Sequence, residues 1–325
     1  MAWVIIEAMS LLSNLLDSQK WLMLDGGLAT ELEARGHNLD DVLWSARLLA
    51  DDPAAIRRVH ADYLHAGADI LITASYQASP AGFQQQGYSA AEAANLLQRS
   101  VRLAQEARDA FWAEGQNRPG RSRPLVAASV GPYGAYLADG SEYSGQYGLS
   151  VADLVTFHQP RLHILSATRP DLFAFETIPS AREAQAIAHL LGEYSEMPAW
   201  VSFSCRDSLH INDGTPLAEA VRPLLAQPAG LVAVGVNCTA PRFVPDLLRR
   251  LSAVTDLPLV AYPNSGERYD TDRRCWIGLT TPVDFGRAAE AWFDAGARLI
   301  GGCCRTRPEH IRRMRVALEA RIGRR

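Results

Sequence analysis

Eight short apolar runs recur along the chain, and the segments between them place apolar residues at helical spacing. Nearly continuous apolar runs of this length are typical of parallel strands that are buried on both faces. The sequence therefore predicts eight buried parallel strands. They are expected at residues 21–27, 68–76, 124–131, 171–177, 199–205, 230–238, 257–264 and 297–304.

Helix boundaries can be read in the intervening segments. Asp52 stands at an N-cap position and Gly67 follows the last apolar position, so a helix is expected between them. Pro160 is expected to kink or break the helix that begins after Ser150, because proline removes a backbone donor. Three serines precede an acidic residue by three positions, which is the pattern of a capping box: Ser89, Ser150 and Ser180.

Strands that alternate with helices predict a single α/β domain, a (β/α)₈ TIM barrel. The chain has 325 residues, and such a barrel typically needs about 250. A doubly wound sheet is the alternative, but it usually has fewer strands, and no G-x-G-x-x-G motif follows the first run. Residues 1–10 are expected to be an N-terminal extension, and residues 11–325 are expected to form the barrel domain.

Composition and charge narrow the class of protein. The 32 basic and 36 acidic residues give a formal net charge of 32 − 36 = −4, so no nucleic-acid partner is expected. The chain contains no apolar run of about 18 residues, so no membrane span is expected. Five cysteines are too few and oddly numbered for a disulfide framework, which favours a reducing, cytoplasmic location.

Polar and sulfur-containing residues stand where the predicted strands end. In a TIM barrel the active site lies at the carboxyl ends of the strands, so these side chains are expected on one rim. The candidate site residues are Asp25, Gly26, Thr73, Ser75, Glu176, Asn237, Cys238, Asn264, Cys303 and Cys304.

Three of these residues are cysteines, Cys238 and the adjacent pair Cys303 and Cys304. Three converging sulfurs suit Zn²⁺, and three protein ligands leave a fourth position open. Because successive strand residues point to opposite faces, we expect a bulge or bend at Gly302–Cys303 that turns both thiols inward. The chain has no C-x-x-C pair, and a cysteine at a strand end can also be a small buried apolar residue, as we interpret Cys205.

The chemistry of such a centre indicates its substrate. A zinc ion bound by three thiolates is a poor Lewis acid for hydrolysis, but it can bind a further thiol and lower that thiol's pKa. Asp25 and Glu176 can bind an ammonium group, while the Gly26 amide and the Thr73 or Ser75 hydroxyl can bind a carboxylate. The predicted substrate is therefore an amino acid with a thiol, which would attack a soft electrophile such as a sulfonium methyl.

Structural roles are the alternatives for four of these polar residues. Asp25 can serve as a turn or helix cap, and Glu176 can belong to a structural ion pair. Asn237 and Asn264 can be loop residues that hydrogen-bond at the rim. The sequence alone leaves these alternatives open.

Seven motifs, read together, resemble one family. They are LDGGLATELEARG, ADILITASYQASPAGF, ASVGPYGAYLADGSEYSG, FETIPS, GVNC, AYPNSGE and GARLIGGCC, and the likeness extends from about Leu22 to Arg305. The chain resembles the zinc-dependent homocysteine S-methyltransferases, and among them the single-domain enzymes that use S-methylmethionine, and often AdoMet. Thr177 stands where the betaine-dependent branch has a tyrosine, which disfavours betaine as the donor.

The resemblance implies a set of roles and a reaction. Cys238, Cys303 and Cys304 would be the ligands of a Zn²⁺ cofactor, and Asp25 and Glu176 would hold the homocysteine ammonium group. The expected partners are small molecules, L-homocysteine and a sulfonium donor, and the reaction would serve methionine biosynthesis.

The sequence also offers tyrosines that can bind the donor, and it leaves other functions as alternatives. The sulfonium donor can be stabilised by cation–π contact with Tyr76, Tyr133 or Tyr136. The alternatives are a betaine-type or other thiol methyltransferase, and a non-catalytic barrel that binds zinc or thiols. A zinc hydrolase would require histidine or carboxylate ligands, whereas the strand ends offer only thiols.

Overall fold

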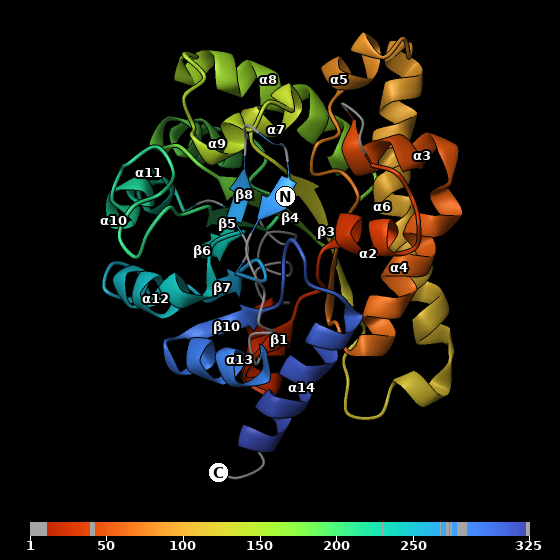
Figure 1. Cartoon of the computed structure of the whole chain (residues 1–325), viewed down its shortest axis with the longest axis vertical. Coiled ribbons are helices and arrows are strands. Elements are labelled where there is room, and N and C mark those ends of the chain that lie inside the picture. Colours follow the sequence, from red (N-terminus) through yellow and green to blue (C-terminus); the bar gives the residue numbers. More distant parts are fainter. Residues whose placement is uncertain are drawn as a thin grey trace.

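The computed structural model describes residues 12–39, 43–228, 230–266, 268–270, 273, 275–277 and 285–322 (Figure 1). Its centre is an eight-stranded parallel sheet in the order β1-β10-β7-β6-β5-β4-β3-β2. β1 and β2 are the two edge strands in this order, and a parallel bridge between Leu24 and Ile70 joins these edges and closes the sheet. The predicted TIM barrel is therefore confirmed. The predicted extension at residues 1–10 lies outside the described residues.

All eight barrel strands occur at the predicted positions, because their apolar runs are buried on both faces. They are β1 (Leu22–Met23), β2 (Ile70–Ile72), β3 (Leu125–Val130), β4 (Leu172–Ile178), β5 (Ala199–Phe203), β6 (Leu231–Asn237), β7 (Leu259–Tyr262) and β10 (Ala297–Ile300). A separate antiparallel hairpin, β8 (Arg268–Asp270) and β9 (Cys275–Ile277), follows β7.

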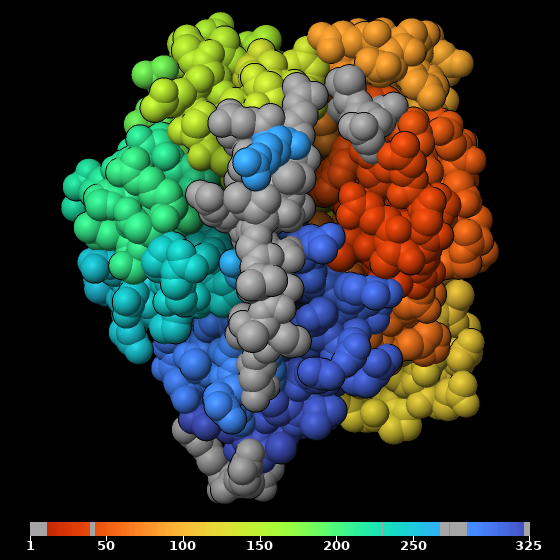
Figure 2. Space-filling model, viewed as in Figure 1, coloured from red at the N-terminus to blue at the C-terminus, as the bar shows by residue number. Residues whose placement is uncertain are grey.

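Helices surround the strands (Figure 1). The α-helices are α2 (Leu28–Ala34), α3 (Leu48–Asp51), α4 (Pro53–Ala66), α5 (Pro80–Gln85), α6 (Ala90–Ala113), α7 (Tyr133–Leu137), α8 (Val151–Ser166), α9 (Ala181–Glu193), α10 (Leu217–Ala220), α11 (Arg222–Ala226), α12 (Val244–Ser252), α13 (Phe285–Asp294) and α14 (Pro308–Ile322). The 3₁₀ turns are η1 (Trp44–Arg47), η2 (Gly115–Asn117), η3 (Ser141–Tyr143) and η4 (Pro241–Phe243). In the space-filling view the red-to-orange and the green-to-cyan parts of the chain lie on opposite sides of the molecule (Figure 2).

A short helix closes the amino ends of the strands. Residues 12–19 are helical, and Leu12 belongs to the cluster of apolar side chains inside the barrel. The same cluster contains Leu22, Leu125 and Leu172, which begin β1, β3 and β4. The interior is thus a packed core at this end, and a cavity can lie only towards the carboxyl ends. No helix in the described part of the chain is long and apolar enough to cross a membrane.

The helix signals hold with two exceptions. Asp52 caps α4 through the Ala55 amide at 3.0 Å, and the capping boxes at Ser89 and Ser150 both form. Of the kink or break expected at Pro160, the break is wrong, because α8 continues through this residue to Ser166.

The second exception is the capping box at Ser180. Its hydroxyl accepts the Glu183 amide at 3.1 Å, but the Glu183 carboxylate does not bond back to the cap. That carboxylate is fully buried and accepts hydrogen bonds from His158 Nε2 at 2.9 Å and from the Tyr133 amide at 2.7 Å. Tertiary partners therefore outcompete the local one, and they tie α9 to the chain segment that follows β3.

Candidate active site

A cavity of about 890 Å³ opens at the carboxyl ends of the barrel strands. This volume lies within the ~300–1,000 Å³ that is usual for small-molecule sites. Seven of the ten candidate residues line it: Asp25, Gly26, Thr73, Glu176, Cys238, Cys303 and Cys304.

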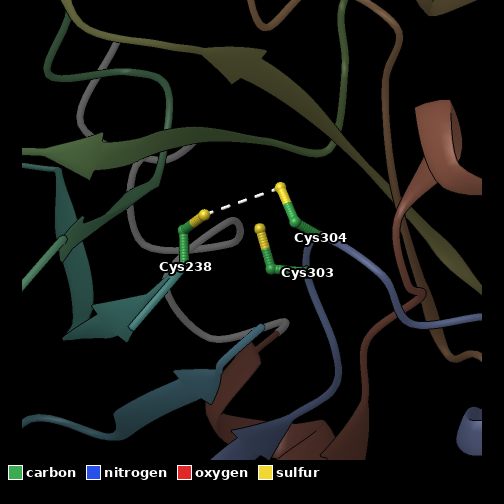
Figure 3. Close-up of side chains that lie close together, drawn as sticks. All are labelled: Cys238, Cys303 and Cys304. Atoms are coloured by element: carbon green, nitrogen blue, oxygen red, sulfur yellow. Dashed lines mark hydrogen bonds between the residues drawn. The ribbon is translucent and has the colours of Figure 1, made fainter. Parts of the chain in front are cut away.

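The three thiols meet at this cavity. Cys238 directly follows β6, and Cys303 and Cys304 follow β10, with β7 between these two strands in the sheet. Their Sγ atoms all lie within 4.8 Å of one another, and those of Cys238 and Cys304 are 3.6 Å apart (Figure 3). Residues separated by 65 positions or more in the chain thus form one donor set that can hold a metal ion.

A turn beyond the strand, and not a bulge within it, directs both adjacent thiols inward. β10 ends at Ile300, before the cysteine pair. The Cys303 amide donates to the Pro263 carbonyl at 2.8 Å, and the Cys303 carbonyl accepts the Thr306 amide at 3.1 Å. Of the bulge or bend expected at Gly302–Cys303, the structure has the bend, in a turn that is free of the strand's alternation.

The two glycines before the thiols are needed for space and not for backbone conformation. Neither Gly301 nor Gly302 has a positive φ. A Cβ atom on Gly301 would lie 2.6 Å from Leu24 Cβ, and one on Gly302 would lie 2.3 Å from Thr306 Oγ1. These contacts are far inside van der Waals distance, so only glycine allows β10 to approach the first strand and the turn to close.

Four residues that line the cavity have left-handed backbone conformations that are unusual outside glycine: Trp44, Ala138, Thr177 and Cys238. Thr177 has a φ of 61° and Cys238 a φ of 45°, and each such conformation costs about 1–3 kcal/mol. The Asn237 side chain holds Thr177 in its position. Its Oδ1 accepts the Thr177 amide at 2.7 Å, and its Nδ2 donates to Thr177 Oγ1 at 2.8 Å and lies 4.0 Å from Cys303 Sγ. Asn237 is fully buried beneath the cavity and acts as a support.

The thiol cluster is electrostatically suited to a cation. Hydrogen bonds from the Cys303 and Cys304 thiols hold the pKa of Cys238 well below its usual value. The pKa values of Cys303 and Cys304 are raised in turn by their interaction with Cys238. One thiolate therefore forms readily, and its negative charge disfavours ionisation of the other two thiols. A positive ion at the centre would allow all three to ionise.

Two buried carboxyl groups lie beside the thiols. Asp25 is 2% exposed and Glu176 is 6% exposed. Burial raises the pKa of Asp25 well above its usual value, and burial together with the nearby Cys303 raises the pKa of Glu176 to about 8. Asp25 Oδ2 accepts the Ile72 amide at 2.9 Å, while its Oδ1 has no hydrogen-bond partner among the described residues. Such a pair suits a cationic ligand group such as an ammonium.

Other candidate hydroxyls and amides are already occupied. Thr73 lines the cavity, but its Oγ1 lies 2.7 Å from Ser75 Oγ and accepts the Ser129 amide at 3.0 Å. Ser75 is fully buried and donates to the Ser129 carbonyl at 2.8 Å, so it supports the wall behind Thr73. Asn264 does not line the cavity, and its Oδ1 accepts the Gly266 amide at 2.9 Å.

Glu142 and Tyr143 are among the residues of the cavity wall that the sequence did not single out. The Tyr143 hydroxyl lies 3.8 Å from Cys238 Sγ. Of the three tyrosines proposed for cation–π contact, Tyr76 lines the cavity, whereas Tyr133 and Tyr136 pack against Phe157. Glu142 and Tyr143 could have been found from their position in the chain. They belong to the GSEY segment, which follows the carboxyl end of β3, and loops at this end of a barrel usually carry the functional residues.

Comparison with known proteins gives consistent matches over nearly the whole chain. The family model described as homocysteine S-methyltransferase matches residues 22–318. Homocysteine S-methyltransferase YbgG of Bacillus subtilis (strain 168) is 49% identical over 303 residues, which cover 93% of this chain and 96% of the relative. Homocysteine S-methyltransferase of Escherichia coli (strain K12) is 50% identical over 314 residues, with 95% and 98% covered. The metallated crystal structure of the homocysteine methyltransferase MmuM from Escherichia coli matches with a TM-score of 0.83 at 49% identity, covering 95% and 98%.

Proposed function

The chain belongs to the homocysteine S-methyltransferase family, and from that premise we propose that it uses Zn²⁺ to methylate L-homocysteine from a sulfonium donor. S-methylmethionine is the proposed donor, with AdoMet as a second, and methionine is the product. The observation that carries this proposal is the three-thiol cluster at the wall of an open cavity, beside two buried carboxyl groups.

The donor set fits zinc. Zn–S bonds of about 2.3 Å in a tetrahedral site place sulfurs about 3.8 Å apart, and the Cys238 and Cys304 sulfurs are 3.6 Å apart. Cys238, Cys303 and Cys304 would hold the ion, which leaves one of four positions for a ligand from the cavity. When bound, zinc supplies positive charge that lowers the pKa of a fourth thiol.

Asp25 and Glu176 orient the acceptor. Both are close enough to Cys303 for its charge to raise their pKa, so an ammonium group between them lies near the thiol cluster. The short chain of homocysteine then directs its thiol towards the three cysteines. Alignment of this kind, and not a protein base, is the main contribution of the residues to the rate.

The reaction balances without an additional reagent. The homocysteine thiol loses its proton to solvent, and its sulfur forms a bond to the donor methyl carbon. The bond between that carbon and the sulfonium sulfur breaks, and its electron pair remains on the leaving sulfur as a neutral thioether. Two opposite charges are lost in this step, so a cavity partly closed to water favours it.

A donor assay tests the proposed function. We expect the zinc-loaded protein to form methionine from homocysteine with S-methylmethionine, more slowly with AdoMet, and not with betaine. Isotopically labelled methyl groups and mass spectrometry would identify the donor. Stoichiometric zinc and homocysteine binding without methyl transfer from any sulfonium would contradict the enzyme and support the non-catalytic binding barrel.

Gly302→Ala should weaken metal binding without removing a ligand. The new Cβ must displace Thr306, whose Oγ1 donates to the Cys303 carbonyl at 2.6 Å. We expect zinc affinity to fall about 10–100-fold, the range seen when groups behind metal ligands are altered. Competition with a chelator measures this change. Gly192→Ala is the matched control, since its Cβ would meet nothing closer than 3.9 Å, and equal affinities in the two variants would refute the steric argument.

A further inference from the structure

The chain segment between β3 and α8 forms a wall of the cavity that the acceptor site does not use. Glu142 and Tyr143 of η3 contribute to this wall. The Tyr143 hydroxyl lies 3.8 Å from Cys238 Sγ, so the wall lies beside this thiol. The Asp25 carbonyl, in contrast, accepts the Gly302 amide at 3.1 Å, next to Cys303. The cavity therefore has acidic groups on two flanks of the thiol cluster.

Glu142 is an acid without a visible partner. Its Oε2 is buried and has no hydrogen-bond partner in the part of the chain that the structure describes. Burial raises the pKa of its carboxyl group to about 7. A buried carboxylate is costly unless it is paired, so a cationic ligand group at this wall would be its natural partner.

The position of Glu142 is built into the loop. A Cβ atom on Gly134 would lie 2.3 Å from the Glu142 backbone nitrogen, so α7 packs directly against this residue. The segment is held in turn by Glu183, which accepts the Tyr133 amide at 2.7 Å. A carboxylate on a fixed wall can select ligand charge without prior ordering of the loop.

We propose that the Glu142 carboxylate is the counter-charge for the cationic methyl donor and thereby selects donors by charge, an inference that rests on the proposed function. Asp25 and Glu176 account for the acceptor's ammonium group, and Glu142 is the one further acid among the described cavity residues that is not exposed, on the other flank of the thiols. Methyl transfer removes the sulfonium charge, so this attraction holds the donor but not its thioether product. Glu142 therefore contributes to donor binding more than to the chemical step.

Glu142→Gln tests the assignment in the zinc-loaded enzyme. Loss of a charge-assisted contact should raise the KM and the Kd for S-methylmethionine at least about tenfold. The kcat, the homocysteine KM and the zinc content should stay within about twofold of the wild type. Calorimetric titration of the donor in the absence of homocysteine gives the Kd without turnover. Glu142→Asp, which keeps the charge, should recover part of the affinity.

Glu33→Gln is the matched control, because Glu33 is an exposed acid on the rim of the same cavity. It should leave donor affinity within about twofold of the wild type. A parallel titration with trimethylsulfonium locates the charge. Weaker binding of both ligands to Glu142→Gln supports pairing with the sulfonium. Weaker binding of S-methylmethionine alone would place Glu142 at the donor's ammonium group, which the thioether product keeps, and would overturn selection by the sulfonium charge.

Three further outcomes would overturn the inference: an unchanged donor Kd in Glu142→Gln, an equal loss of homocysteine affinity, or loss of zinc. Failure of the proposed function would look different. In that case the wild-type protein itself would transfer no methyl group from S-methylmethionine, whatever residue stands at position 142.

Discussion

Cys303→Ser should leave the barrel folded but remove both its zinc and its methyltransferase activity. Serine has nearly the same shape, and Cys303 lies beyond the end of β10, so the packing of the strand is preserved. A hydroxyl is a much weaker zinc ligand than a thiolate. With the site empty, only a few per cent of the homocysteine thiol is ionised at pH 7, and its alignment is lost. We expect the rate to fall at least about a hundredfold.

Three measurements separate loss of metal from loss of fold in this variant. Elemental analysis gives the zinc content, methionine formation gives the rate, and thermal unfolding is compared after zinc is removed from both proteins, because bound metal itself raises the Tm. Cys205→Ala is the matched control. Cys205 is a buried cysteine outside the cluster, so this variant should keep its zinc and activity. A zinc-free Cys303→Ser protein with the wild-type rate would refute the proposed mechanism.

Asp25→Asn should raise the homocysteine KM about 30-fold while zinc remains bound. The amide oxygen can still accept the Ile72 amide, but the unpartnered Oδ1 position no longer carries charge towards the acceptor's ammonium. Removal of one member of a buried charge pair costs about 2–5 kcal/mol, and the lower end applies because Glu176 remains. Steady-state kinetics at saturating donor measures the change.

A thiol without the amino group provides the control for Asp25→Asn. Wild-type protein should use 4-mercaptobutanoate poorly, and the variant should use it equally poorly, since the lost contact involves only the ammonium group. If the Asp25→Asn change reduced the use of 4-mercaptobutanoate as much as the use of homocysteine, or if the variant lost zinc, Asp25 would be supporting the metal site and not binding the amino group.

Several features of the protein follow from local sequence. Each barrel strand reads as an apolar run because both of its faces are buried, and this pattern needs no knowledge of neighbours. Caps such as Asp52 and Ser89 use only residues three positions away. The alternation of strands and helices then fixes which strand ends share a rim, so the cavity-lining role of Cys238 and Asp25 could be anticipated from their positions alone.

Tertiary structure decided how these residues are used. Ser75 and Thr73 end the same strand, yet packing against β3 occupies their hydroxyls. Glu183 has the local pattern of a capping box, but His158 and the Tyr133 amide offer it a buried alternative.

The same holds for the wall and the thiols. Glu142 is held at the cavity wall because its backbone packs against Gly134 of α7, a contact that no periodicity in the sequence predicts. The pattern of apolar and polar residues predicts which side chains face the core or the rim, because this orientation depends only on spacing along one helix or strand. The distances between groups on different elements, such as the 3.6 Å between the Cys238 and Cys304 sulfurs, depend on how the elements pack, and only the folded barrel sets them.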